Sequence, residues 1–351
     1  MGMGAALFGV APTFGVAFAG RLLVGVGASV ILISWLSLAA EWFRPQEFGT
    51  VSGFTQAVGN TGALVASSPL ALLVEAAGWR HTFVLIGAAT VALAALAGAL
   101  VRDRPQALGL PPVNPERGGR RAPRLAETRG GIAGVVRNPR TWPPILVAGG
   151  VYMGLITFVG LWGIPYLAHV YGLRRVEAAN LVALAALGLC VGSPLVGWLS
   201  DRWLGRRRLP MALFTLLFTA CWAPLLLPAE QRLSPGALAP FVFLLGFFAS
   251  GMVLVWPCVR EVNDPERVGI AVGFVNAPIF LGFAVMQWLS GAVLDAHWTG
   301  LASAGVRVYP PEAYRAIFAL CLAASTGALL AAWFVTETRC RSVWHPSATS
   351  S

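Results

Sequence analysis

Long apolar runs, bounded by short stretches of charge, glycine and proline, make up most of this chain. After an apolar stub that ends near Val10, nine runs approach or exceed the about 20 residues that a helix needs to cross hydrocarbon. Their approximate limits are 16–39, 49–74, 83–101, 143–168, 177–199, 209–228, 238–259, 268–294 and 315–335. Because an open-ended segment satisfies its backbone hydrogen bonds in lipid only as a helix, these lengths predict an all-α polytopic membrane protein.

The composition of the 351 residues excludes a soluble globule. Charged residues make up 11% of the chain and apolar residues 57%, whereas soluble domains carry about 25% charge. All 25 basic residues are arginine, against 15 acids, and they lie between the apolar runs rather than on one face. A nucleic-acid partner is therefore not expected. The five cysteines show neither metal nor disulfide spacing, so no metal and no cofactor are predicted.

Arginine is distributed unevenly between the two sides of the predicted helices. The longest polar stretch, 102–140, holds nine arginines and is expected to link two helical bundles. Eighteen of the 25 arginines fall in this linker or in the loops on its side, which are 41–48, 200–208, 260–267 and 336–351. By the positive-inside rule, we predict that the linker and the C-terminus are cytoplasmic and that the chain lies in the inner cell membrane.

An internal repeat divides the chain into two copies of one helical unit. Residues 220 positions apart match in a series of pairs, which includes Glu41/Glu261, Pro45/Pro265, Gly49/Gly269, Gly53/Gly273 and Gln56/Asn276. After a longer loop the offset becomes 235, where Arg80 and Phe83 match Arg315 and Phe318. Parallel repeats of this kind are a transporter architecture, in which substrate is held between the halves near the midplane.

Three motifs of the chain resemble the signatures of a known family. The run Gly197-Trp-Leu-Ser-Asp-Arg-Trp-Leu-Gly-Arg-Arg-Arg208 is similar to a loop pattern Gly-x-Leu-x-Asp-Arg-x-Gly-Arg-Arg, with one extra residue before its Gly-Arg-Arg. The other two motifs, which resemble a fourth-helix pattern and a junction between helices five and six, are Arg21-x-x-x-Gly25-x-Gly27 and Gly78-Trp79-Arg80-x-x-Phe83. On these motifs, which together span the chain, the protein resembles the major facilitator superfamily.

The resemblance implies the fold of that family, two pseudo-symmetric bundles of six helices joined by the linker. The repeat places residue 1 opposite residue 221, midway through the run 209–228. We therefore expect a chain truncated at its N-terminus, holding nine to ten of the twelve helices, from the end of helix three to helix twelve. The implied parts are an incomplete N-terminal bundle at 1–101, the linker at 102–140, a C-terminal bundle at 141–336 and a cytoplasmic tail at 337–351.

The loop motif offers a candidate gate. Asp201 would lie near Gly49 at the N-terminus of helix five, where the helix dipole favours a carboxylate. Such a contact can form in one conformation and be lost in another, as a gate requires. By resemblance, one of three loop arginines would pair with Glu261 at the end of helix ten; setting topology alone is the alternative role. The candidate gate residues are Asp201, Arg202, Gly205, Arg206, Arg207, Glu41 and Glu261.

Amide side chains inside the predicted spans are candidate substrate contacts, because polar groups in hydrocarbon normally face a cavity or a partner. The resemblance implies that helices five and eleven flank a central cavity. Helix five carries Gln56 and Asn60, and helix eleven carries Asn276 and Gln287. Hydrogen bonding between helices is the alternative role for each of them.

Aromatic residues on helices seven and ten extend this candidate set. Phe158, Trp162 and Tyr166 recur at four-residue steps and are expected to form one face, which lines either the cavity or a packing stripe. Trp256 precedes Pro257 in helix ten, where a proline-induced break can free a carbonyl for a ligand.

Helix four supplies two further candidates, Trp35 and Arg21. Arg21 can bind a substrate carboxylate through two hydrogen bonds, or it can act structurally. No acidic residue or histidine lies at mid-membrane depth in the predicted spans, so a coupling proton or other ion has no assigned site.

The features together predict a monomeric secondary transporter that moves a small polar organic metabolite or organic anion by alternating access. Efflux of drugs or metabolites is the alternative within that class. From another class, the chain can be an inactive truncated remnant or a membrane receptor that binds without translocating. An enzyme is not predicted, because no nucleophile, base and orienting group occur together.

Overall fold

The computed structural model describes residues 1–65, 68–111, 113, 125–228, 231–303 and 306–344. The chain folds into two compact units, each assembled from two stretches of sequence. Unit 1 comprises Met1–Arg44 and Thr61–Arg121, and unit 2 comprises Pro45–Asn60 and Ala122–Ser351. The described secondary structure is helical except for one antiparallel pair of two-residue strands, so the predicted all-α fold is confirmed.

Unit 1 is built on three helices, α1 (Gly2–Val10), α2 (Phe14–Trp42) and α4 (Ser68–Leu100), followed by the short helix η2 (Pro105–Leu108). Helix α1 packs against both longer helices. Glycines allow a close approach: a Cβ atom on Gly4 would lie 2.7 Å from the carbonyl oxygen of Gly20, and one on Gly87 would lie 2.7 Å from that of Gly2. Small residues at helix crossings are typical of membrane bundles.

A glycine breaks α4. Gly78 has φ 75° and ψ 152°, a backbone conformation that residues with a Cβ atom rarely adopt. Beyond the break, the Arg80 side chain donates from Nη1 to the carbonyl oxygen of Ala11 at 2.7 Å, and its guanidinium lies 4.6 Å from the centre of the Trp79 ring. The polar stretch expected between the runs 49–74 and 83–101 is therefore a turn centred on one non-helical glycine.

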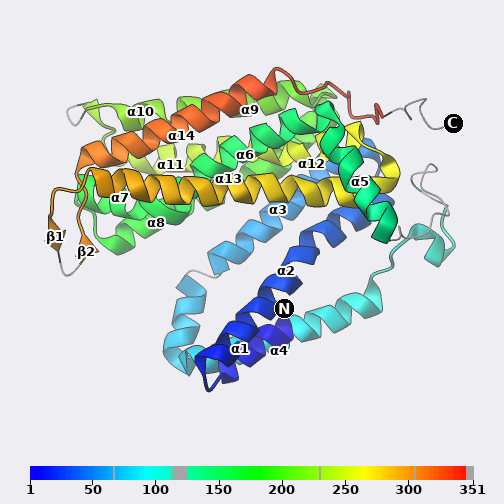
Figure 1. Ribbon diagram of the computed structural model, residues 1–351, viewed down its shortest axis with the longest axis horizontal. Helices are drawn as coiled ribbons and strands as arrows, with labels where there is room; N and C mark the ends of the chain where they lie inside the picture. Colours follow the sequence, from blue (N-terminus) through cyan, green and yellow to red (C-terminus); the bar gives the residue numbers. More distant parts are fainter. Residues whose placement is uncertain (66–67, 112, 114–124, 229–230, 304–305, 345–351) are drawn as a thin grey trace. The chain divides into compact units, whose positions relative to one another are not determined.

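Unit 2 is a helical bundle whose members run largely side by side (Figure 1). Its elements, in chain order, are η1 (Pro45–Glu47), the first part of α3 (Phe48–Val65), α5 (Leu125–Arg137), η4 (Pro139–Thr141), α6 (Trp142–Ile156), η5 (Thr157–Trp162), α7 (Gly163–Tyr171), α8 (Arg175–Trp198), η6 (Leu199–Leu204), α9 (Arg208–Ala220), α10 (Ala223–Leu226), α11 (Pro235–Ala249), η8 (Ser250–Leu254), α12 (Val255–Val262), η9 (Pro265–Arg267), α13 (Val268–Ala296), β1 (Ala302–Ser303), β2 (Val306–Arg307) and α14 (Pro311–Ala332).

The two ends of unit 2 differ. The antiparallel hairpin, in which Ala302 pairs with Arg307, lies at the end that also holds α7 and α10. Helix α5, inside the predicted linker, crosses beside α13 at the opposite end, close to α12 and the C-terminal segment (Figure 1). We call this second end the latch end.

Eight helices, counted over the described part of the chain, are long and apolar enough to cross a membrane. The predicted run 49–74 is not among them, because it falls partly in α3 and partly in α4, on either side of residues 66–67. Large apolar side chains also cover the outside of the bundle; Trp288 and Leu281, for example, are 73% and 68% exposed. Such a surface is stable where lipid covers it, and the chain is an integral membrane protein.

The core of unit 2 is aromatic. Phe218 and Trp222, at the end of α9, pack edge to face with ring centres 5.7 Å apart, and Trp222 lies 5.9 Å from Phe318 of α14. All three side chains are fully buried. This packing fixes the C-terminal part of α9 against the first half of α14.

Candidate functional site

A buried arginine organises the latch end of unit 2. Arg207 lies immediately before α9, after the turn η6 that contains Asp201. Gly205 ends this turn with φ 57°, in the left-handed region that glycine adopts readily. The turn is a π-helical one, which holds one more residue than an α-helical turn, and it thereby accommodates the extra residue of the signature loop.

The Arg207 guanidinium joins two carboxylates that lie far apart in the sequence. Its Nε and Nη2 atoms donate to Oε1 of Glu261 at 3.0 and 2.7 Å, and Nη1 donates to Oγ of Ser200 at 3.0 Å and to Oδ1 of Asp201. The side chains of Arg207, Asp201 and Glu261 are 0%, 0% and 1% exposed. Thr338 donates a further hydrogen bond to Glu261 from its hydroxyl. We call Ser200, Asp201, Arg207, Glu261 and Thr338 the Arg207 cluster.

The cluster keeps its arginine charged. Burial alone would lower the pKa of Arg207, but the carboxylates of Glu261 and Asp201 raise it above its ordinary value. A buried cation held by two carboxylates and a hydroxyl is stable only while those partners stay in place. The arrangement is therefore suited to holding several chain segments in one conformation.

The free oxygen of Asp201 binds the start of helix α3. Its Oδ2 accepts hydrogen bonds from the backbone N–H of Thr50 at 2.5 Å and from the Thr50 hydroxyl at 2.7 Å. Gly49 makes this approach possible, since a Cβ atom there would lie 2.6 Å from Oδ1 of Asp201. The predicted position of Asp201, near Gly49 at the N-terminus of a helix, is what the structure has. A carboxylate at this place satisfies an orphan N–H and interacts favourably with the helix dipole.

The contact continues along α3 and α8 through small residues. A Cβ atom on Gly53 would lie 2.1 Å from the carbonyl oxygen of Ser193, and one on Gly197 would lie 2.3 Å from that of Gly49. One turn further on, the thiol of Cys190 donates to the carbonyl oxygen of Ala57 at 3.5 Å. The two backbones thus touch over several turns, next to the Asp201 contact.

The other predicted gate residues lie outside the cluster. Arg202 is exposed and reaches Glu47 at 4.0 Å, a surface ion pair that contributes little. Arg206 is exposed as well, so of the three loop arginines it is Arg207 that pairs with Glu261. Glu41 is half-buried near the end of α2, in unit 1.

Sequence reasoning missed the contribution of the C-terminal segment. Glu337 accepts hydrogen bonds from the backbone N–H groups of Arg207 at 2.9 Å and Arg208 at 3.1 Å, and so caps α9. Thr338 is the partner of Glu261, and Cys340 is buried against Ser200. A signal was available, because Glu337 and Thr338 form a polar pair directly after the last apolar run.

Of the four amide candidates, three have side chains that the structure describes, and no hydrogen bond joins these three to one another. Gln56 is half-buried on α3, Asn276 is half-buried on α13 and Gln287 is exposed on α13. No hydrogen bond joins these three side chains to another part of the chain that the structure describes. The side chain of Asn60 lies outside the described residues. A substrate role for all four stays a prediction.

The predicted aromatic face on helix seven is wrong. Phe158 and Tyr166 are buried and pack on Phe318 of α14, with ring centres 6.0 and 4.9 Å apart. Trp162 points elsewhere, donating from Nε1 to Oγ of Ser290 on α13 at 2.8 Å. The cause is the π-helical turn η5, which changes the number of residues per turn and puts Trp162 on another side. Phe158 and Tyr166 have the contacts of a packing stripe.

The predicted break in helix ten is present. The 3₁₀ turn η8 ends at Leu254, just before Trp256 and Pro257, because the proline cannot donate to Val253. Trp256 itself is 8% exposed and lies inside the bundle.

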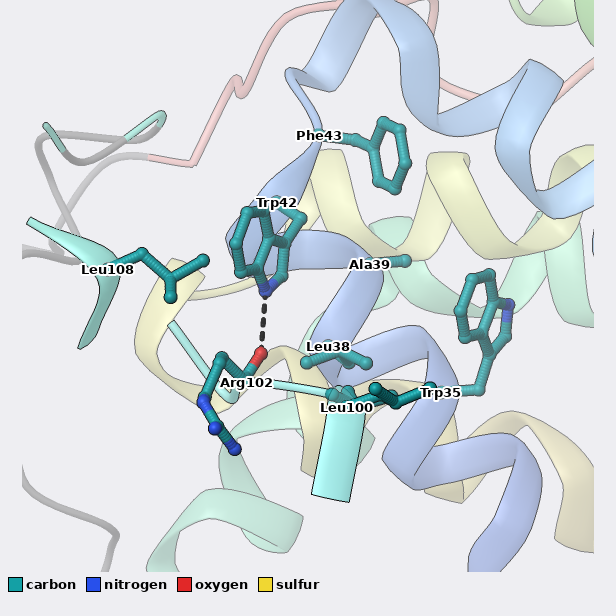
Figure 2. A pocket seen from close by; sticks show the side chains of 9 residues that line it. Trp35, Leu38, Ala39, Trp42, Phe43, Leu100, Arg102 and Leu108 are labelled. Atoms are coloured by element: carbon teal, nitrogen blue, oxygen red, sulfur yellow. Dashed lines mark hydrogen bonds between the residues drawn. The ribbon is translucent and has the colours of Figure 1, made fainter. Parts of the chain in front are cut away.

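In unit 1, Trp35 lines an open pocket of about 350 Å³ between the ends of α2 and α4 (Figure 2). Its walls are mostly apolar, with Leu38, Leu100 and Leu108 among them. Trp42 closes one side by donating from Nε1 to the carbonyl oxygen of Arg102 at 3.0 Å (Figure 2).

Arg21 has the contacts of a structural residue. Its guanidinium lies 4.3 Å from the centre of the Phe8 ring and 5.0 Å from that of Phe83, so it joins α1 to α4 through α2. We expect Arg21→Gln to lower the free energy of unfolding by about 1–2 kcal/mol, since two cation–π contacts are lost, and to leave the KM of transport unchanged. Unfolding in detergent and transport kinetics measure the two effects. Arg21→Lys is the control that keeps a cation; a large rise of KM in Arg21→Gln alone would restore the substrate role.

The fold and the Arg207 cluster define a polytopic helical membrane protein with a buried ion-pair cluster at one end of its bundle. The family model described as Major Facilitator Superfamily matches residues 1–260 and 162–348 of the chain. The chain belongs to this superfamily, and it is not an enzyme.

Two curated relatives are similar to the chain in sequence, and a solved structure shares its fold. The chain is 30% identical over 279 residues to the membrane sensor protein UhpC of Salmonella typhimurium, covering 75% of this chain and 61% of that protein. It is 25% identical over 286 residues to a probable hexose phosphate transport protein of Chlamydia pneumoniae, covering 75% and 62%. The transporter FucP in its outward conformation shares the fold, with a TM-score of 0.69 at 17% identity over 96% of this chain and 81% of FucP. The chain spans about three fifths of the length of these two curated relatives.

Proposed function

We propose that the protein is a secondary active transporter that moves a small organic anion across the inner cell membrane by alternating access. The relatives named for hexose phosphate transport support a phosphorylated sugar or a similar anion. The observation that carries the mechanism is the Arg207 cluster, which ties α3 to the turn between α8 and α9. This contact between α3 and the turn is the gate. It closes the cytoplasmic side, toward which the arginine-rich loops project.

The cluster suits a gate because its contacts are strong but few. Asp201 holds α3 through two hydrogen bonds at a helix N-terminus, and both are lost if α3 moves away from α8. A contact of this kind stabilises the closed state by about 2 kcal/mol, enough to set its population but not to trap it.

Asp201→Asn tests this gate. The variant keeps the size of the side chain but weakens the closed state, so we expect the maximum rate of transport to fall at least about tenfold while KM stays within about twofold. Counterflow of labelled glucose 6-phosphate in proteoliposomes measures both quantities. Arg206→Gln, which removes an exposed charge of the same loop, is the matched control with an unchanged rate. A change in KM alone would contradict a gate.

A second function is favoured by one observation, the 30% identity to a protein named as a membrane sensor. A sensor would bind the same class of anion without carrying it across. Equilibrium binding of glucose 6-phosphate together with the absence of counterflow would support the sensor, whereas counterflow supports the transporter.

A further inference from the structure

We propose that the segment Val335–Val343, which follows α14, is a strap that holds the gate closed, with Glu337 and Thr338 as the residues that position Arg207 and Glu261. The proposal deepens the gate described above and rests on it. It adds the C-terminal segment as a working part of the gate.

The strap contacts the start of α9 and the end of α12, the two segments that the ion pair between Arg207 and Glu261 joins. Glu337 accepts from the N–H groups of Arg207 and Arg208 and thereby fixes the start of α9. Thr338, 3% exposed, donates its hydroxyl hydrogen bond to Oε2 of Glu261, while Arg207 holds Oε1. The backbone N–H of Val343 donates to the carbonyl oxygen of Glu261 at 2.8 Å. One short segment therefore holds both the end of α12 and the start of α9.

The backbone of the strap shows that these contacts determine its course. Arg339 and Cys340 both have positive φ values, 51° and 59°. Residues with a Cβ atom rarely adopt this region, and two in succession are rarer still. The turn between Thr338 and Val343 is therefore kept by the contacts on either side of it, and we expect it to relax when they are lost.

A continuous line of hydrogen bonds connects the strap to helix α3. It runs from Thr338 to Glu261, from there to Arg207, to Asp201 and to Thr50. Each link is buried or half-buried and involves a charged group, so the loss of one link weakens its neighbours. The strap and the contact with α3 should accordingly open together.

Cys340 reports the state of the strap. Its side chain is 2% exposed, its thiol donates to the carbonyl oxygen of Ser200 at 3.5 Å, and burial raises its pKa to about 12. When the strap leaves, the thiol regains its ordinary pKa and meets solvent, so alkylation becomes faster. The other four cysteines lie within the helical bundle.

The test measures alkylation of Cys340 in the full chain in inside-out membrane vesicles, whose cytoplasmic face is open to the reagent, using a membrane-impermeant maleimide and mass spectrometry of the labelled peptide. We expect Thr338→Val to raise the alkylation rate at least about tenfold, because Glu261 loses a charge-assisted hydrogen bond. Thr338→Ser restores the hydroxyl and should keep the slow rate. Thr336→Val is the matched control, since Thr336 lies in the same strap without a hydrogen bond from its side chain to another described residue. Equal rates in Thr338→Val and Thr336→Val would overturn the proposal.

A second measurement separates the strap from a tail that is merely attached. Asp201→Asn, at the far end of the line of hydrogen bonds, should also speed alkylation of Cys340, and an unchanged rate would overturn the proposal. If Thr338→Val does not fold, Glu337→Gln replaces it, and the alkylation rate of Cys340 is again expected to rise. Alkylation needs no transported solute, so a chain that fails in counterflow but passes this test refutes the transport function and leaves the strap in place.

Discussion

Replacing Arg207 with glutamine is expected to lower the free energy of unfolding of the protein by about 3–5 kcal/mol. The side chain is 0% exposed and neutralises two carboxylates that are themselves 0% and 1% exposed. Without the guanidinium, Asp201 and Glu261 would face each other as buried charges with no cation between them. Either they take up protons or the loop moves out, and both cost stability.

Denaturant or thermal unfolding in detergent measures this loss. Arg206→Gln, which removes the exposed arginine next to it, should change stability by no more than about 0.5 kcal/mol. A triple variant, Arg207→Met with Asp201→Asn and Glu261→Gln, should recover most of the loss, because the buried charges leave together. Equal unfolding curves for Arg207→Gln and Arg206→Gln would show that the buried ion pairs are not formed in the membrane protein.

Gly53→Val is expected to separate α3 from α8. A Cβ atom at Gly53 would lie 2.1 Å from the carbonyl oxygen of Ser193 and 2.9 Å from Cα of Pro194, so the obstacle is backbone that cannot rotate away. Overpacking of a well-packed contact typically costs about 1–3 kcal/mol, and a collision with backbone belongs at the upper end or above it. The helices avoid this cost by moving apart, which also breaks the hydrogen bonds from Thr50 to Asp201.

Gly59→Val is the control for this prediction, since Gly59 lies on the same helix and a Cβ atom there would meet no atom of the described residues within 4 Å. The unfolding midpoint and the maximum rate of transport should both fall in Gly53→Val and stay unchanged in Gly59→Val. If the two variants behave alike, the effect comes from valine in a helix and not from the contact with α8.

The sequence carried enough information to anticipate part of the Arg207 cluster. The loop motif put Asp201 at the start of a helix near Gly49, and the family resemblance implied that one of three loop arginines pairs with Glu261. Choosing Arg207 among three arginines was beyond the motif, because the choice depends on the π-helical turn that takes up the extra residue. The aromatic face of helix seven failed for the same kind of reason, since a fixed step of four residues assumes an uninterrupted α-helix.

The strap escaped sequence analysis because hydrophobic patterns report only which residues meet lipid or core. Thr338 lies 77 residues from Glu261 and Glu337 lies 130 residues from Arg207 in the chain. Polar contacts over such separations leave no periodic trace in a single sequence. They become visible only when α9, α12 and the end of α14 are packed into one bundle.

The division of α3 between two units has a consequence for engineering the protein. Residues 45–60 belong with the C-terminal bundle, although more than sixty residues of unit 1 separate them from it along the chain. A cut in the linker would therefore not yield two self-sufficient halves, because the C-terminal fragment would lack the helix that receives Asp201 and covers Gly197. Chimaeras that exchange halves with a relative should place their junction before Pro45, or exchange α3 and α8 as a matched pair.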